Sequence, residues 1–158
     1  MIRLAITGHR GLPGTTIQLV DEALRDELRD CSVPFVGLSC LADGADSLFA
    51  RAVLDHGGKL TVIVPAAHYR DELPSEHHPV YDALLRQAND VVRMDHTDST
   101  SQAHMDASIA MIERTDRLLA VWDGQPARGY GGTADIVRAA EERNLPVTRI
   151  WPAGAKRD

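Results

Sequence analysis

Short apolar runs alternate with longer segments of helical periodicity along the whole chain. The apolar runs are continuous, as expected for parallel strands covered on both faces. They lie at 2–7, 34–39, 59–64, 90–94, 117–122 and 146–151, and helical patterns fill the intervals at about 15–30, 44–57, 77–89, 101–115 and 132–144. This alternation predicts an α/β fold, a Rossmann-like three-layer α/β/α domain with a mainly parallel six-stranded sheet of order about 3-2-1-4-5-6.

The pattern also divides the chain. Residues 1–152 read as one Rossmann-like domain, and residues 153–158 as a flexible tail. The longest irregular segment, 65–79, contains three prolines and is either a lid over a site or a partly helical surface excursion.

Composition narrows the classes of partner. The chain has 158 residues and a net charge of −6, which disfavours nucleic acid and anionic membranes as main partners. Two cysteines fit a reducing cytoplasm better than a disulfide framework. The first residues lack the features of a signal peptide, and no segment approaches the ~20 apolar residues of a membrane span. We therefore expect a cytoplasmic protein.

The loops after the predicted strands indicate where a ligand would bind. In an open parallel sheet the site lies beyond the carboxyl ends of the strands, where the strand order reverses. With the expected order, this place falls between strands 2–7 and 90–94. The loops around it are the richest in Gly, Asp, Ser and Thr: 7–14, 39–46, 95–100 and 122–133.

Glycines precede the last predicted helix, in the stretch GYGGTADIV at 129–137. A helix start offers unpaired N–H groups, and glycine lets an anion approach them. Gly131, Gly132 and Thr133 are therefore a candidate phosphate cradle, or else a tight turn with a helix cap. The loop after the first strand adds Gly8 and Arg10, whose guanidinium suits a phosphate or carboxylate. Neither loop matches a Walker A motif or a G-x-G-x-x-G fingerprint.

These stretches, in this order, resemble the SLOG superfamily of Rossmann-like nucleotide-binding proteins, which includes LOG phosphoribohydrolases, DprA and YpsA-like proteins. ITGHRGL at the first strand is similar to the YpsA-type opening. Residues 36–65 resemble the DprA-type stretch with its Gly-x-Asp helix start. Residues 104–124, together with the GGT of 131–133, resemble the second half of the domain.

The resemblance implies a nucleotide or nucleotide-derived ligand, with its phosphate at Gly131–Thr133. The loop with Gly8, His9 and Arg10 would close over the same ligand, and His9 is a candidate phosphate donor. Asp43 and Asp46 would accept from ribose hydroxyls, or would only cap the helix. Asp106 takes the place where relatives often have Asn, and here it follows Met105 instead of Arg.

The resemblance gives less support to catalysis. LOG enzymes carry Pro-Gly-Gly-x-Gly-Thr-x-x-Glu, and the position of that Glu is Ile136 here. Asp135 is one residue short, about 100° away around a helix. N-glycosidic cleavage needs a carboxylate, and nothing selects one among Asp43, Asp46, Asp106 and Asp123.

The expected function is therefore nucleotide binding, as a sensor or carrier. The alternative is a LOG-like phosphoribohydrolase, or another N-glycosidic-bond enzyme acting on nucleoside monophosphates. DprA-like binding of single strands is a third possibility, which the negative charge and the few aromatic residues oppose. The seven histidines lack metal-ligand spacing, so we expect no metal, and we expect no required cofactor. The resemblance implies a homodimer, because relatives often dimerise through helices that flank the sheet. Tyr130 could stack on a base.

Overall fold

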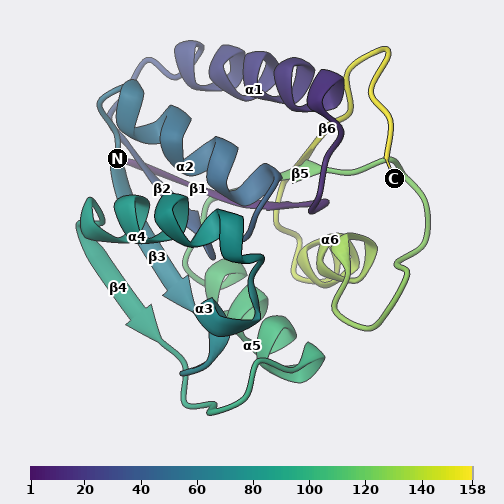
Figure 1. Cartoon of the computed structure of the whole chain (residues 1–158). Coiled ribbons are helices and arrows are strands. Elements are labelled where there is room, and N and C mark those ends of the chain that lie inside the picture. Colours follow the sequence, from purple (N-terminus) through teal and green to yellow (C-terminus); the bar gives the residue numbers. More distant parts are fainter. Residues whose placement is uncertain (158) are drawn as a thin grey trace.

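The computed structural model describes residues 1–157 and contains a parallel sheet of six strands (Figure 1). The strands are β1 (Ile2–Gly8), β2 (Phe35–Ser39), β3 (Lys59–Val64), β4 (Asp90–Arg93), β5 (Arg117–Val121) and β6 (Val147–Ile150). The helices are α1 (Gly14–Arg29), α2 (Ala45–Asp55), α3 (Tyr69–Glu72), the 3-10 turn η1 (Ser75–His77), α4 (His78–Arg86), α5 (Ser101–Ile112) and α6 (Thr133–Glu142). The predicted Rossmann-like α/β fold is confirmed.

The strand order is β4-β3-β2-β1-β5-β6, so the predicted order was wrong about β4. This strand pairs with β3 at the edge of the sheet, and β1 pairs directly with β5. Both ends of β4, Asp90 and Arg93, are exposed, whereas four of the five residues of β5 are buried. Charged residues suit an edge strand, and a fully apolar strand suits the centre. The order therefore reverses between β1 and β5, and a site is expected there.

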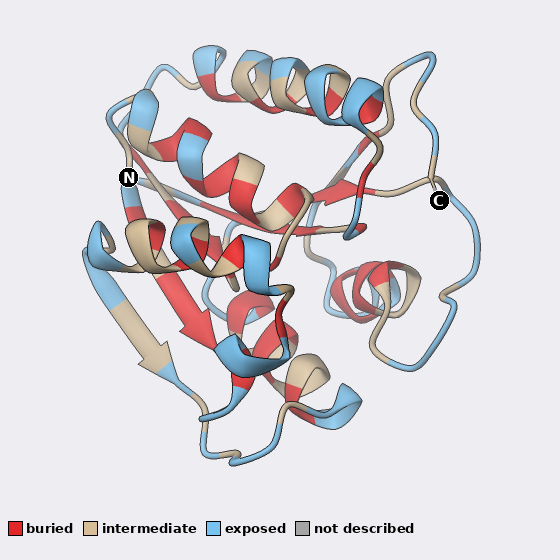
Figure 2. Ribbon diagram, in the orientation of Figure 1, coloured by how far each residue is buried: buried red, intermediate tan, exposed pale blue. Residues whose placement is uncertain are grey.

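Helices cover both faces of the sheet (Figures 1 and 2). Residues of β1 alternate between the faces, as strand geometry requires. Leu4 and Ile6 pack in a cluster with residues of α1 and α2, and Ala5 packs in one with residues of α5 and α6. A third cluster joins α4 and the segment around α3 to β3. The strand ends are thus held between two helical layers.

The irregular segment 65–79 is partly helical, with α3 and η1 inside it. Tyr69 and Leu73 are buried in the third cluster, which fixes the segment to the domain. Within residues 1–157, no helix has the length and apolar character needed to cross a membrane.

The predicted tail makes defined contacts with α1. Thr16, fully buried, donates from Oγ1 to the Lys156 carbonyl at 2.9 Å and accepts from the Lys156 amide at 2.8 Å. These two hydrogen bonds hold the chain one residue before Arg157, which reaches the cavity described below.

Thr16→Val is expected to release this segment while the rest of the domain stays folded. Valine keeps the shape of the side chain but can make neither hydrogen bond. We expect hydrogen exchange at the Lys156 amide to become at least about tenfold faster, since one to two bonds of ~1 kcal/mol are lost. Thr15→Val, at an exposed position on the same helix, is the matched control. Unchanged exchange in Thr16→Val would contradict the assigned contact.

Candidate ligand-binding site

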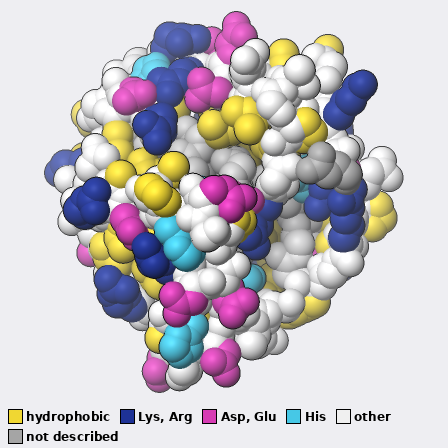
Figure 3. Space-filling model, in the orientation of Figure 1, with side chains coloured by type: hydrophobic (Ala, Val, Ile, Leu, Met, Phe, Trp, Pro, Cys, Tyr) yellow, Lys and Arg dark blue, Asp and Glu magenta, His cyan; other side chains and the backbone are white. Residues whose placement is uncertain are grey.

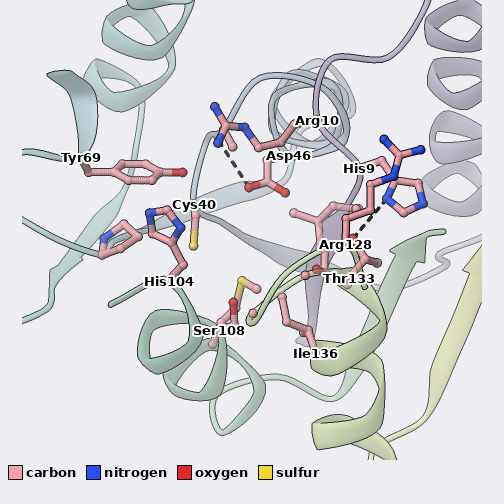
Figure 4. Close-up of a pocket in the computed structure, with 18 of the residues that line it drawn as sticks. His9, Arg10, Cys40, Asp46, Tyr69, His104, Ser108, Arg128, Thr133 and Ile136 are labelled. Atoms are coloured by element: carbon pink, nitrogen blue, oxygen red, sulfur yellow. Dashed lines mark hydrogen bonds between the residues drawn. The ribbon is translucent and has the colours of Figure 1, made fainter. Parts of the chain in front are cut away.

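A cavity of about 250 Å³ opens at the carboxyl ends of β1, β2 and β5, where the strand order reverses (Figure 4). Its walls come from the loops that follow β1, β2, β3 and β5, from α5 and from the start of α6. The loop at 95–100 does not line it. Because β4 lies at the far edge of the sheet, the expectation that this loop borders the site was wrong.

Seven of the nine predicted ligand-binding residues line the cavity: Gly8, His9, Arg10, Asp46, Gly131, Gly132 and Thr133. Asp43 does not line it but holds the loop after β1, because its carboxylate accepts from Arg10 Nε at 2.9 Å and from the Gly11 amide at 3.2 Å. Asp106 lies outside. It accepts from Gln102 at 2.7 Å and faces His96 Nε2 at 2.8 Å, on an open part of α5.

Three arginines from three separate segments line the cavity: Arg10, Arg128 and Arg157. Arg10 is paired with Asp43 at 2.8 Å. Neither Arg128 nor Arg157 forms an ion pair with a carboxylate of residues 1–157. Neither arginine was among the residues predicted from the sequence. Arg128 could have been found, since it lies in the glycine-rich loop, but Arg157 carries no local signal.

The start of α6 offers fewer free amides than the glycines suggested. The Gly131 amide donates to the Asp135 carboxylate at 3.0 Å, and the Gly132 amide donates to the Gly129 carbonyl at 3.2 Å. The amides of Thr133 and Ala134 have no partner in the described part of the chain. A phosphate cradle here would therefore use the first helical turn and the Thr133 hydroxyl, while the two glycines shape the turn, Gly131 with φ +83°.

Ile136 faces the cavity and Asp135 does not, as the helical rotation between them requires. The carboxylate of Asp135 is engaged at the helix start instead. The position that carries Glu in LOG enzymes thus presents an apolar side chain to the cavity.

His9 connects three segments and is only 3% exposed. Its Nε2 lies 3.1 Å from the Asp123 amide and 3.2 Å from the Asp123 carboxylate, and its Nδ1 lies 3.5 Å from Thr133 Oγ1. Burial and the charge of Arg157 lower the pKa of His9, although Asp123 opposes this shift. A neutral His9 therefore positions the Thr133 hydroxyl, and both of its nitrogens face protein groups.

The opposite half of the cavity holds other polar side chains (Figure 4). Burial raises the pKa of Asp46 to about 7, although a hydrogen bond from the Ala42 amide and the charge of Arg10 oppose it. Burial and Arg10 lower the pKa of His104, whose Nε2 lies 2.7 Å from Ser99 Oγ. Burial also raises the pKa of the Cys40 thiol and of Tyr69. At neutral pH the charges of this half are therefore those of Arg10 and Asp46.

Asp46 is the one carboxylate among the described residues that lines the cavity. In the part of the chain that the structure covers, no group of three or more His, Cys, Asp or Glu side chains is arranged to hold a metal ion. The chemistry available here is therefore that of arginines, helix-start amides, hydroxyls and a single carboxyl group.

Comparison with known proteins identifies the fold. No protein-family model matches this sequence. No match is found among curated proteins. The structure is similar to DNA processing protein A (DprA) from Streptococcus pneumoniae, with TM-score 0.71 and 15% identity over 97% of this chain and 51% of that one. It is also similar to the molybdenum cofactor binding protein from the phototrophic bacterium Rippkaea orientalis, with TM-score 0.62 and 12% identity over 94% and 75%.

The protein therefore shares its Rossmann-like α/β fold with these two proteins, as the sequence pattern predicted. The chain spans about half the length of the S. pneumoniae DprA. The Helicobacter pylori DprA, with TM-score 0.66 and 16% identity over 98% of this chain and 68% of that one, is described for its single-stranded DNA binding mode. The expectation that nucleic acid is an unlikely partner therefore has no support from the structural neighbours.

Proposed function

We propose that the cavity binds a nucleotide or nucleotide-derived ligand and that the protein acts as a sensor or carrier of it. The observation that carries the proposal is the convergence of Arg10, Arg128 and Arg157 on one cavity of a chain whose net charge is −6. Guanidinium groups bind phosphate with paired, charge-assisted hydrogen bonds. Arg10 is paired with Asp43, but Arg128 and Arg157 have no carboxylate partner among residues 1–157, and without an anionic ligand their like charges would repel each other.

The geometry supports one orientation of the ligand. Arg128 lines the cavity beside Thr133, near the positive end of the α6 helix dipole (Figure 4). An anionic group at this end would meet the guanidinium, the Thr133 hydroxyl and the first-turn amides. The remainder of the ligand would extend toward Tyr69 and Met111, which also line the cavity.

Arg128→Ala is expected to weaken the binding of nucleoside monophosphates by roughly 10- to 100-fold, since a hydrogen bond to a charged group contributes ~1.5–3 kcal/mol. Calorimetry with AMP, GMP and the corresponding nucleosides measures this effect. The loss of affinity caused by Arg128→Ala should be much smaller for the nucleosides, which have no phosphate. Arg114→Ala is the control, because Arg114 is exposed and its guanidinium donates only to the Ala110 carbonyl of α5. Equal affinity in Arg128→Ala and wild type would contradict the proposed phosphate end.

A hydrolase of N-glycosidic bonds is the second candidate function, and Asp46 is the observation that favours it. An acid with a pKa near neutrality in a binding cavity can donate or accept a proton during bond cleavage. Incubation with nucleoside monophosphates tests this alternative. Free base released by the wild type and not by Asp46→Asn would favour the enzyme, whereas thermal stabilisation without turnover would favour the sensor or carrier.

A further inference from the structure

Two buried hydroxyl groups in the cavity have no protein partner. Tyr69 is 4% exposed and Ser108 is 6% exposed, yet neither hydroxyl makes a hydrogen bond to any described residue. Both side chains line the cavity, and the Tyr69 hydroxyl points into its interior (Figure 4). No fully enclosed side-chain nitrogen or oxygen of residues 1–157 lacks a partner, so these hydroxyls are open to the cavity. Buried polar groups are normally paired, and these two are available to a ligand.

The Asp46 carboxyl group is also largely uncommitted. Its one hydrogen bond comes from the Ala42 amide, at 3.3 Å to Oδ2. The nearby Arg10 forms its ion pair with Asp43 instead, at 2.8 Å. A carboxylate accepts about four hydrogen bonds and donates none when ionised. Asp46 therefore presents a surplus of acceptors beside the Tyr69 hydroxyl, which can donate.

The walls around these groups suit a flat ring. Tyr69 and His104 meet edge to face, with ring centroids 5.7 Å apart, and Met111 and Pro65 add apolar surface to the same cavity. Aromatic and thioether groups pack well against planar rings. The polar groups would then contact the edge of the ring and not its face.

We propose that Asp46 and Tyr69 read the edge of a heterocycle that carries two adjacent N–H donors beside a carbonyl group. This is the 2-amino-4-oxopyrimidine edge shared by guanine and pterins. Asp46 accepts from the ring N–H and the amino group, and Tyr69 donates to the carbonyl oxygen. The inference rests on the proposed function, because the arginine end of the cavity holds the ligand's phosphate.

Calorimetry with three monophosphates tests the edge. GMP has both donors and the carbonyl, IMP lacks the amino group, and AMP has a ring acceptor in place of the ring N–H. We expect GMP to bind roughly 10- to 100-fold more tightly than AMP, the usual range for one bidentate contact, with IMP between them. Neopterin 3′-phosphate is a second arm that distinguishes the two sources of this edge. Whichever of it and GMP binds more tightly is the favoured class.

Two variants assign the recognition to the named residues. Asp46→Asn replaces two acceptors with one acceptor and one donor, the complement of the adenine edge, and should remove or reverse the preference for GMP over AMP. Tyr69→Phe should weaken GMP binding about fivefold or more and weaken AMP binding less. Tyr81→Phe is the matched control, because Tyr81 is buried against Tyr69 but does not line the cavity.

The outcomes separate this inference from the proposed function. If nucleotides bind with a dependence on Arg128 but GMP, IMP and AMP bind alike, base reading is overturned and phosphate binding stands. If Asp46→Asn lowers the affinity for GMP and AMP equally, Asp46 does not read the edge, and the inference fails. If neither nucleotide nor neopterin phosphate binds to the wild type, both proposals are overturned.

Discussion

Gly8→Ala is expected to lower the stability of the protein by about 3 kcal/mol. Gly8 ends β1 where the strand passes between α2 and β5. A Cβ atom there would lie 2.5 Å from Ala45 Cβ, 2.8 Å from Val121 Cβ and 3.0 Å from the Val121 carbonyl oxygen. None of these atoms is the end of a flexible side chain, so β1, β5 or α2 must move. Overpacking of this kind costs about 1–3 kcal/mol, and more where backbone must shift.

Thermal unfolding measures this change. A loss of about 3 kcal/mol corresponds to a fall in Tm of roughly 10 °C for a domain of this size. Gly14→Ala is the control, since a Cβ at Gly14 meets no atom within 4 Å, and alanine favours the first turn of α1. The assigned contact would be wrong if Gly8→Ala melted at the same temperature as Gly14→Ala.

This packing role explains why glycine patterns give incomplete information about a site. Gly8 was a candidate ligand-binding residue, and it does line the cavity, but its neighbours also require glycine for close packing. Gly132 is similar, because a Cβ there would lie 2.9 Å from Ala127 Cβ. In sequence, a glycine needed for packing looks the same as one needed for an anion. Only the positions of Ala45 and Ala127 distinguish the two.

The hydrophobic pattern located the strands, because a parallel strand covered by helices on both faces is apolar along its whole length. The pattern could not place β4 in the sheet, because the strand has the same apolar run whether it pairs with β3 or with β1. The structure distinguishes them through the exposed Asp90 and Arg93 at the sheet edge. Because of this error, the crevice was expected between β1 and β4 and not between β1 and β5. The loop at 95–100 was therefore wrongly placed beside it.

The site residues that the sequence could predict, such as Arg10 and Asp46, lie close to a glycine-containing loop. Tyr69 and Arg157 come from a proline-rich excursion and from the presumed tail. They reach the cavity because Leu73 and Thr16 anchor those segments through tertiary contacts. Such contacts join residues that are far apart in sequence, and the periodicity of hydrophobic residues gives no sign of them.

Asp46→Asn is expected to stabilise the ligand-free protein at pH 8 and to have a clearly smaller effect at pH 5. Burial raises the pKa of this carboxyl from 3.8 to about 7 in the folded state. Between these two values the folded protein holds a proton that the unfolded chain has lost. Stability therefore falls as the pH rises from about 4 to about 7, and the full penalty is present above pH 7.

A rise in the pKa of Asp46 from 3.8 to about 7 corresponds to roughly 4 kcal/mol. Contact with solvent in the cavity reduces this, and we expect a gain of about 2 kcal/mol for Asp46→Asn at pH 8. Urea unfolding at pH 5 and pH 8 measures the difference. Asp98→Asn, which removes an exposed carboxylate, controls for the change in net charge. Equal effects of Asp46→Asn at both pH values would show that Asp46 ionises as freely as a surface residue.

A stability penalty at Asp46 has a physical meaning for the site. Asparagine would fill the same space and keep the hydrogen bond from Ala42 without a buried charge. A protein that retains an acid there gives up stability above pH 7, as is common for residues that bind or react. Ligand donors that satisfy the carboxylate would remove the penalty. GMP should therefore stabilise the wild type more at pH 8 than at pH 5, and this difference should disappear in Asp46→Asn.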